Sequence, residues 1–137
     1  TTFDYLKDRS SKQINFKFIA PSNSINVAIN PALHSWTIEN LVKNAIDAMK
    51  GKGSLTLAIE EKEDYVRIKI IDSGKGIPKS SFTKVFEPGF TTKQRGWGLG
   101  LSLTKRIVQE YHKGKIKVAS SEIGKGTTMQ ISYKKVV

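Results

Sequence analysis

The strongest constraint on the fold is a glycine-rich segment, residues 72–100, near the middle of the chain. It reads DSGKGIPKSSFTKVFEPGFTTKQRGWGLG and holds more than half of the chain's 11 glycines and two of its four prolines. Glycine and proline interrupt helices and strands, so no long regular element can cross this segment. Loops of this length inside compact domains are typically functional or disordered. The regular structure must therefore lie in the two flanking parts of the chain.

Two stretches outside this segment have helical spacing of apolar residues. One runs to Lys50, starts at the Asn30-Pro31 signal and stops at Gly51. The second covers residues 101–112, and the glycine that follows it resembles a C-cap. Its expected buried face consists of Leu101, Ile107, Val108 and Tyr111, and its expected cap is Gly114.

Alternating apolar and polar residues predict strands in the rest of the chain. Residues 14–20 and 24–29 are expected to form a hairpin, and residues 55–60 and 65–71 a second one. Residues 115–119 and 128–133 close the chain around a glycine turn. The order of elements predicts an α+β fold, a two-layer sandwich in which a mixed, mostly antiparallel sheet is covered on one face by helices.

Composition narrows the class of protein. The length of 137 residues fits one domain, and the lack of cysteine excludes disulfide scaffolds, thiolate metal sites and cysteine nucleophiles. Apolar runs are too short for a membrane span, and the first residues do not resemble a signal peptide. The net charge of +11 favours an anionic partner: a nucleotide, a nucleic acid or an acidic protein.

A polar stripe follows the first predicted helix. Asn40, Asn44 and Asp47 stand at i, i+4 and i+7, so they share one side of the helix. Such a stripe is either a solvated helix face or a set of oxygen ligands for a hard cation. Taken alone, the spacing leaves both interpretations open.

Two features of the glycine-rich segment suggest a ligand. Asp72 ends a strand before two glycines, where it either forms an ordinary Asx turn or accepts a hydrogen bond from an exocyclic amine. Residues 96–100, GWGLG, open a helix whose N–H groups can face a phosphate. The P-loop pattern fails at Gly126, and the dinucleotide-binding pattern fails at Leu101.

The order of the motifs is more informative than any one of them. The chain contains ENLVKNAIDA at 39–48, DSGKGIP at 72–78, VFEPGFTTK at 85–93, GWGLGLS at 96–102 and GKGTT at 124–128. Together they resemble the N box, first glycine box, F box, second glycine box and final glycine box of sensor histidine kinase catalytic domains. The resemblance implies the Bergerat fold shared with gyrase, chaperone and mismatch-repair ATPases. It also implies that ATP and Mg²⁺ bind between the helices and a flexible lid.

The resemblance also implies roles for individual residues. Asn44 would ligate Mg²⁺, Asn40 would contact the phosphates or a metal-bound water, and Asp72 would bind the adenine amine. Lys93 would act with the two asparagines in phosphoryl transfer, and Thr127 would assist Asp72 through a hydroxyl or a water. The other implied nucleotide contacts are Asp47, Gly74, Gly76, Ile77, Phe86, Thr91, Thr92, Gly96, Trp97, Gly98, Leu99, Gly100 and Leu101.

Two departures from the family pattern affect the expected chemistry. Asp47 and Ala48 stand where many relatives have a basic residue and an aromatic one, so Lys43, Lys93 and Arg95 become candidates for neutralising phosphate. Asn40 stands where the ATPase branches have a glutamate base. Without that base, hydrolysis should be slow and transfer to a positioned nucleophile favoured.

The phosphate acceptor is expected outside this chain, because His34 and His112 look like surface residues at helix ends. Residues 1–12 are interpreted as the remnant of a linker and residues 13–137 as the catalytic domain. The expected partners are a helical dimerisation and phosphoacceptor domain of the same protein and a response regulator, but no nucleic acid. We expect a cytoplasmic, monomeric domain from a homodimeric protein that can be membrane-anchored. The alternatives are a stand-alone ATPase or protein serine kinase of the same superfamily and, far behind them, a nucleic-acid-binding module.

Overall fold

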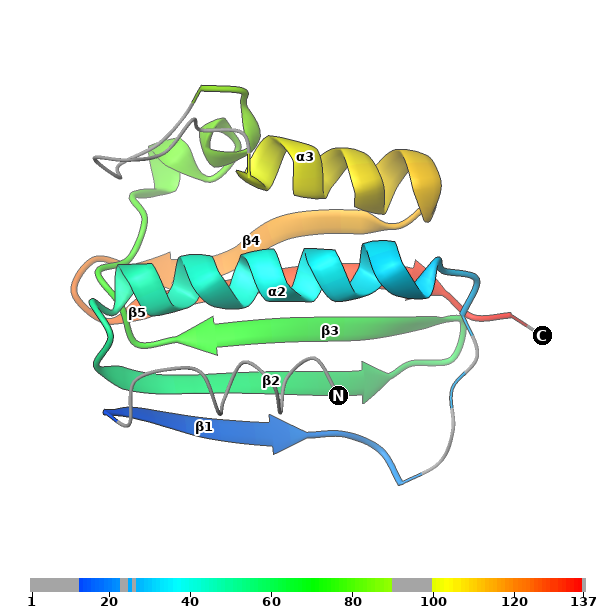
Figure 1. Cartoon of the computed structure of the whole chain (residues 1–137), viewed down its shortest axis with the longest axis horizontal. Helices are drawn as coiled ribbons and strands as arrows, with labels where there is room; N and C mark the ends of the chain where they lie inside the picture. Colours follow the sequence, from blue (N-terminus) through cyan, green and yellow to red (C-terminus); the bar gives the residue numbers. More distant parts are fainter. Residues whose placement is uncertain (1–12, 23–24, 26, 90–99, 137) are drawn as a thin grey trace.

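The computed structural model describes residues 13–22, 25, 27–89 and 100–136. Five strands form one sheet, and α2 and α3 lie together on one of its faces (Figure 1). The strands are β1 (Ile14–Ile19), β2 (Gly53–Glu61), β3 (Tyr65–Asp72), β4 (Lys115–Glu122) and β5 (Gly126–Lys134). The helices are α2 (Pro31–Ala48) and α3 (Gly100–Arg106), with short turns at η1 (Lys79–Ser81), η2 (Lys84–Phe86) and η3 (Ile107–Tyr111). The predicted two-layer α+β sandwich is confirmed.

The strand order in the sheet is β1-β2-β3-β5-β4. The β2–β3, β3–β5 and β4–β5 pairs are antiparallel, while β1 pairs with β2 in parallel. The two later hairpins agree with the sequence prediction. Leu55, Ile70 and Ile131 are almost fully buried between this sheet and the helices.

The predicted first hairpin is wrong. Among the described residues of its second half, 25 and 27–29, none belongs to a strand, and Val27 makes only an isolated bridge to Lys135. Ile25, Val27 and Ile29 are instead partly buried against the core. In these residues, alternation of apolar side chains therefore marks contact with the core and not pairing in a strand.

Helix α2 agrees with its sequence signals. The Asn30 side chain accepts a hydrogen bond from the Leu33 N–H at 3.1 Å, and Pro31 occupies the first turn. Lys50 and Gly51 both adopt positive φ after the last turn, which ends the helix. The buried face includes Leu41 and Val42. No helix among the described residues is long and apolar enough to cross a membrane.

The second helix differs from the prediction at its C-terminal end. Residues 107–111 form a π-helical turn, and the His112 N–H reaches the Ile107 carbonyl at 3.1 Å. The wider turn changes which side chain faces inward, so His112 is buried and Tyr111 is 66% exposed. The left-handed conformation falls on Lys113 rather than on Gly114. Gly114 is needed for another reason, because a side chain there would collide with Ser132 and Tyr133 of β5.

Candidate nucleotide-binding site

One residue of the polar stripe on α2 contacts α3. Asn40 is half-buried, and its Nδ2 donates a hydrogen bond of 2.7 Å to Oγ1 of Thr104 on α3. Asn44 is also half-buried, one turn further along α2, and Asp47 is exposed. The stripe therefore contacts α3 at Asn40 and becomes solvent-exposed at Asp47.

Asp72 is a buried carboxylate at the end of β3, opposite Thr127 of β5. Its Oδ1 accepts hydrogen bonds from the Gly74 N–H at 2.8 Å and the Thr127 N–H at 3.2 Å. Burial raises the pKa of Asp72, and these two bonds oppose that rise without cancelling it. Both of these hydrogen bonds use Oδ1, so Oδ2 is the carboxylate oxygen left to accept a further hydrogen bond.

Thr127 assists Asp72 differently from the expectation. Its backbone N–H makes the contact, while its hydroxyl lies 2.7 Å from Oγ of Ser121 on β4. Ser121 Oγ also accepts a hydrogen bond of 2.7 Å from the Ile77 N–H. Ser121 thus joins the loop after β3 to the β4–β5 hairpin, a role that no sequence motif indicated.

The loop after β3 is held closely against its neighbours. A side chain at Gly74 would come within 2.9 Å of Ala48 at the end of α2, and the Lys75 N–H donates to the Ala48 carbonyl at 3.1 Å. Gly76 has a φ of +81° and lies against the Glu122 backbone. These two positions require glycine because the backbones approach too closely for a Cβ atom.

The start of α3 completes the described part of the site. Gly100 lies against the Asn40 amide, and Leu101 is half-buried against the core. Phe86, at the end of η2, is buried, and the Lys105 ammonium lies 5.7 Å from its ring centre. Phe86 and Leu101 are therefore packing residues at the border of the site. Several predicted contacts lie outside the described residues: Thr91, Thr92, Lys93, Arg95, Gly96, Trp97, Gly98 and Leu99.

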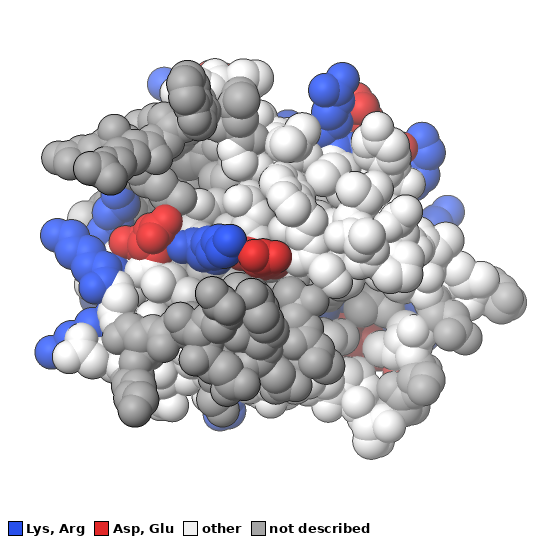
Figure 2. All heavy atoms as spheres, in the orientation of Figure 1, with Lys and Arg blue, Asp and Glu red and all other residues white. Residues whose placement is uncertain are grey.

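Charge is distributed unevenly over the molecule. Over α2, Figure 2 shows a short line of charged side chains in which a basic one lies between acidic ones. Lys43, a candidate for neutralising phosphate, forms an exposed ion pair with Glu39 at 2.9 Å. On the face of the sheet opposite the helices, Arg67 of β3 lies in one cross-strand row with Lys115 of β4, and Lys69 lies in a second row with Lys117. Much of the positive charge of the sheet therefore faces away from the candidate site.

The donor set at the stripe fits a magnesium ion delivered with a nucleotide. The described residues contain no cluster of three histidine, cysteine or acidic side chains. Mg²⁺ in phosphate-transfer sites needs only one or two protein oxygens because phosphates and waters fill its other positions. The amide of Asn44, one turn along α2 from Asn40, would supply one such oxygen.

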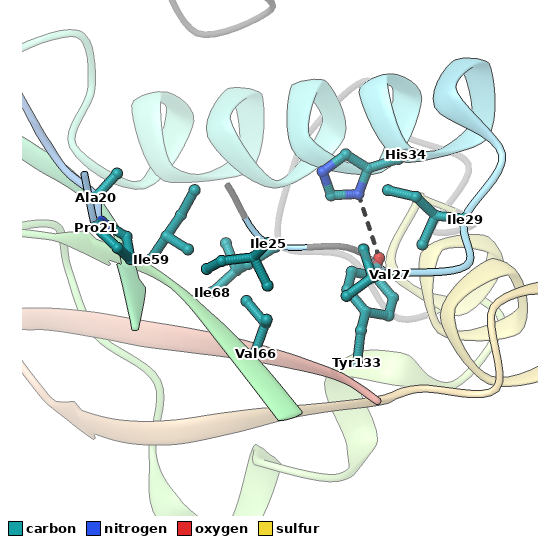
Figure 3. Close-up of a pocket in the computed structure, with 10 residues that line it drawn as sticks. All are labelled: Ala20, Pro21, Ile25, Val27, Ile29, His34, Ile59, Val66, Ile68 and Tyr133. Atoms are coloured by element: carbon teal, nitrogen blue, oxygen red, sulfur yellow. Dashed lines mark hydrogen bonds between the residues drawn. The ribbon is translucent and has the colours of Figure 1, made fainter. Parts of the chain in front are cut away.

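A second feature, which the sequence did not predict, lies toward the other end of the sheet. A cavity of about 240 Å³ is bordered by aliphatic side chains together with His34 and Tyr133, whose Nδ1 and hydroxyl oxygen lie 3.4 Å apart (Figure 3). Val66 and Ile68 line this cavity, and Asp72 lies four residues beyond Ile68 along β3, a distance of about 13 Å. The cavity is therefore separate from the candidate nucleotide site.

The two histidines are not the surface residues that the sequence suggested. His112 is buried, its Nε2 accepts a hydrogen bond from the Asn30 N–H at 3.0 Å, and its ring packs edge-on against Tyr133. Burial lowers the pKa of His112. Burial, and then the charge of His112, lowers the pKa of His34.

We expect the domain to lose stability as the pH falls through the histidine range. Both pKa values lie below the unfolded value of 6.5, so the unfolded chain binds more protons there. The melting temperature should fall by a few degrees between about pH 7.5 and pH 5.5. His112→Gln keeps an acceptor for the Asn30 N–H but cannot titrate, so the melting temperature of this variant should decrease less over the same pH range. An equally steep decrease in this variant would contradict the role given to His112.

Comparisons with known proteins agree with the architecture and the motifs. Residues 33–136 match the family described as Histidine kinase-, DNA gyrase B-, and HSP90-like ATPase. The chain is 37% identical over 125 residues to sensor histidine kinase ZraS of Escherichia coli K12, covering 91% of this chain but 26% of ZraS.

Solved structures agree as well. The catalytic domain of histidine kinase ThkA superposes with a TM-score of 0.86 at 30% identity, covering 98% of this chain and 89% of that domain. ThkA in complex with response regulator protein TrrA gives a TM-score of 0.84 at 28% identity, covering 98% of this chain and 38% of ThkA. The chain therefore belongs to the histidine kinase-, DNA gyrase B- and HSP90-like ATPase family, as the ATP-binding catalytic domain of a sensor histidine kinase.

Proposed function

We propose that this domain binds Mg-ATP and donates the γ-phosphoryl group to a histidine on a separate dimerisation and phosphoacceptor domain, for relay to a response regulator. The buried carboxylate of Asp72 carries the nucleotide part of the proposal. Its Oδ1 is held by two backbone N–H groups, which leaves Oδ2 to accept a hydrogen from the adenine amine.

The proposed reaction breaks the bond between the γ-phosphorus and the oxygen that bridges it to the β-phosphate, and forms a phosphorus–nitrogen bond to the acceptor imidazole. A bound Mg²⁺ supplies charge stabilisation for the phosphates as the bond breaks. Asn44 would provide an oxygen for that metal, and Lys93 would place a positive charge near the γ-phosphate. Asn40 cannot take a proton from water near neutral pH, which favours transfer over hydrolysis.

The partners belong to the same proposal. The chain spans about a quarter of the length of ZraS, so an acceptor domain and a sensing part would lie elsewhere in the protein. ThkA has been solved with a response regulator, which supports a receiver domain as the final acceptor here. We further propose a cytoplasmic location for this domain, because ATP is available there, within a homodimeric protein that can be membrane-anchored.

The test uses this domain, radiolabelled ATP with Mg²⁺, and the dimerisation domain encoded upstream. We expect the label to reach the dimerisation domain as a phosphohistidine, stable to base and labile to acid, while the catalytic domain alone hydrolyses ATP very slowly. Rapid hydrolysis by the isolated domain, or label on its own serine or threonine residues, would support a stand-alone ATPase or serine kinase instead.

A further inference from the structure

Thr104 connects the two helices of the site through its hydroxyl group. It lies on α3 and has no exposed surface. Its Oγ1 is 2.7 Å from the Gly100 carbonyl, one turn earlier, and 2.7 Å from Nδ2 of Asn40 on α2. A single buried hydroxyl thus contacts both the start of α3 and the N box.

The number of protons available fixes the direction of these bonds. A threonine hydroxyl has one proton, and two oxygens 2.7 Å apart require a proton between them, so Oγ1 donates to the Gly100 carbonyl. Because its only proton is used in that bond, the hydroxyl can only accept a hydrogen bond from Asn40. Asn40 must present its NH₂ group to Thr104, which fixes the orientation of an amide that could otherwise flip.

The amide oxygen of Asn40 is consequently the acceptor that remains for a ligand. Oδ1 would lie 3.1 Å from a Cβ atom built on Gly100, so the amide rests against the backbone at the start of α3. Phosphate oxygens are acceptors and do not bond to another acceptor, whereas a metal-bound water is a donor.

We infer that Thr104 is a positioning residue that orients the Asn40 amide, so that Oδ1 accepts a hydrogen bond from a metal-bound water of Mg-ATP. This inference rests on the proposed function and decides between the two partners, phosphate or metal-bound water, that the sequence left open for Asn40. It also gives a reason for glycine at position 100, because a side chain there would press against the oriented amide.

The chain contains a matched control residue. Thr37 is also fully buried, and its hydroxyl also donates to the carbonyl four residues earlier, at 2.9 Å from Leu33 O, but it bonds to no other side chain among the described residues. Thr37→Val and Thr104→Val therefore remove the same kind of intrahelical bond, and only Thr104→Val also releases Asn40. Thr104→Ser keeps the hydroxyl.

The first measurement is the affinity of a non-hydrolysable ATP analogue, by calorimetry, with and without Mg²⁺. In Thr104→Val the gain in affinity from Mg²⁺ should fall about fivefold, the effect of one neutral hydrogen bond, and the metal-free affinity should stay within about twofold of the unmodified chain. Thr104→Ser and Thr37→Val should keep the full gain in affinity that Mg²⁺ gives the unmodified chain. Equal effects of the two valine variants, or an equal loss with and without metal, would overturn the inference.

The second measurement needs no nucleotide and no variant. In the NMR spectrum of the unmodified domain, one Asn40 side-chain amide proton should exchange with water about tenfold more slowly than those of Asn15, which is exposed on β1. Equal exchange rates would overturn the positioning role. If the unmodified domain binds no analogue at all, the proposed function fails, while this measurement still tests whether Thr104 holds the amide.

Discussion

Replacing Asp72 with Asn is expected to weaken ATP binding by at least tenfold. The asparagine oxygen can still accept from the Gly74 and Thr127 N–H groups, which bind Oδ1 in the native chain. With the oxygen in that position, the NH₂ group of the new asparagine takes the place of Oδ2. This NH₂ group and the adenine amine are both donors, so they could not form a hydrogen bond. The lost charge-assisted hydrogen bond alone contributes about 1.5–3 kcal/mol, which corresponds to roughly ten- to a hundredfold in affinity.

The fold should tolerate this change. Burial raises the pKa of Asp72, so a neutral group costs less to bury at this position than the carboxylate. The melting temperature should therefore change little near neutral pH. Asp64→Asn, in the exposed turn between β2 and β3, is the control and should leave affinity unchanged. Calorimetric titration that finds native affinity in Asp72→Asn would exclude the adenine assignment.

Replacing Asn44 with Ala should reduce phosphoryl transfer to the dimerisation domain by about a hundredfold or more, since metal stabilisation of the transition state contributes several kcal/mol. Asn44 follows Asn40 by one helical turn and is half-buried on the same side of α2. Removing its amide oxygen would remove a metal ligand, while the adenine contact at Asp72 stays intact.

Two affinities separate a metal role from a structural one in this variant. Without Mg²⁺, the affinity of Asn44→Ala for ATP should lie within about twofold of the native value, whereas with Mg²⁺ it should fall further. Asn15→Ala, on exposed β1, serves as the control. If affinity falls equally in both conditions, Asn44 has a structural role only.

The periodic elements could be predicted from the sequence because their patterns depend on local contacts. Helix α2 has a capping Asn30, a proline in the first turn and apolar residues on one face, and all three features act within a few residues. The pairing of β1 depends on a distant strand. Alternation encodes which face of a strand is buried but not which strand lies beside it, so the pattern of residues 14–19 does not reveal that they pair in parallel with β2.

The same distinction applies to the site. Asp72 and the asparagines of α2 are recognisable because their motifs are contiguous in sequence. Thr104 and Ser121 gain their importance from partners that are distant or belong to other elements, such as Asn40, 64 residues before Thr104, and Ile77, 44 residues before Ser121. The π-helical turn is followed by His112, whose ring packs against Tyr133 of β5, a contact that no local pattern encodes.

The parallel edge strand places Gln13 at the same end of the sheet as Asp72. The chain enters the sheet at Gln13, whose carbonyl accepts a hydrogen bond from the Gly53 N–H at 3.2 Å. Gly53 begins β2, and two residues later Leu55 lies opposite Asp72. Strands are spaced about 4.8 Å apart, so the strand that ends at Asp72 lies about 10 Å across the sheet from the strand that begins at Ile14. A force applied at Gln13 would therefore act two strands away from Asp72, at the opposite end of the sheet from the His34–Tyr133 cavity.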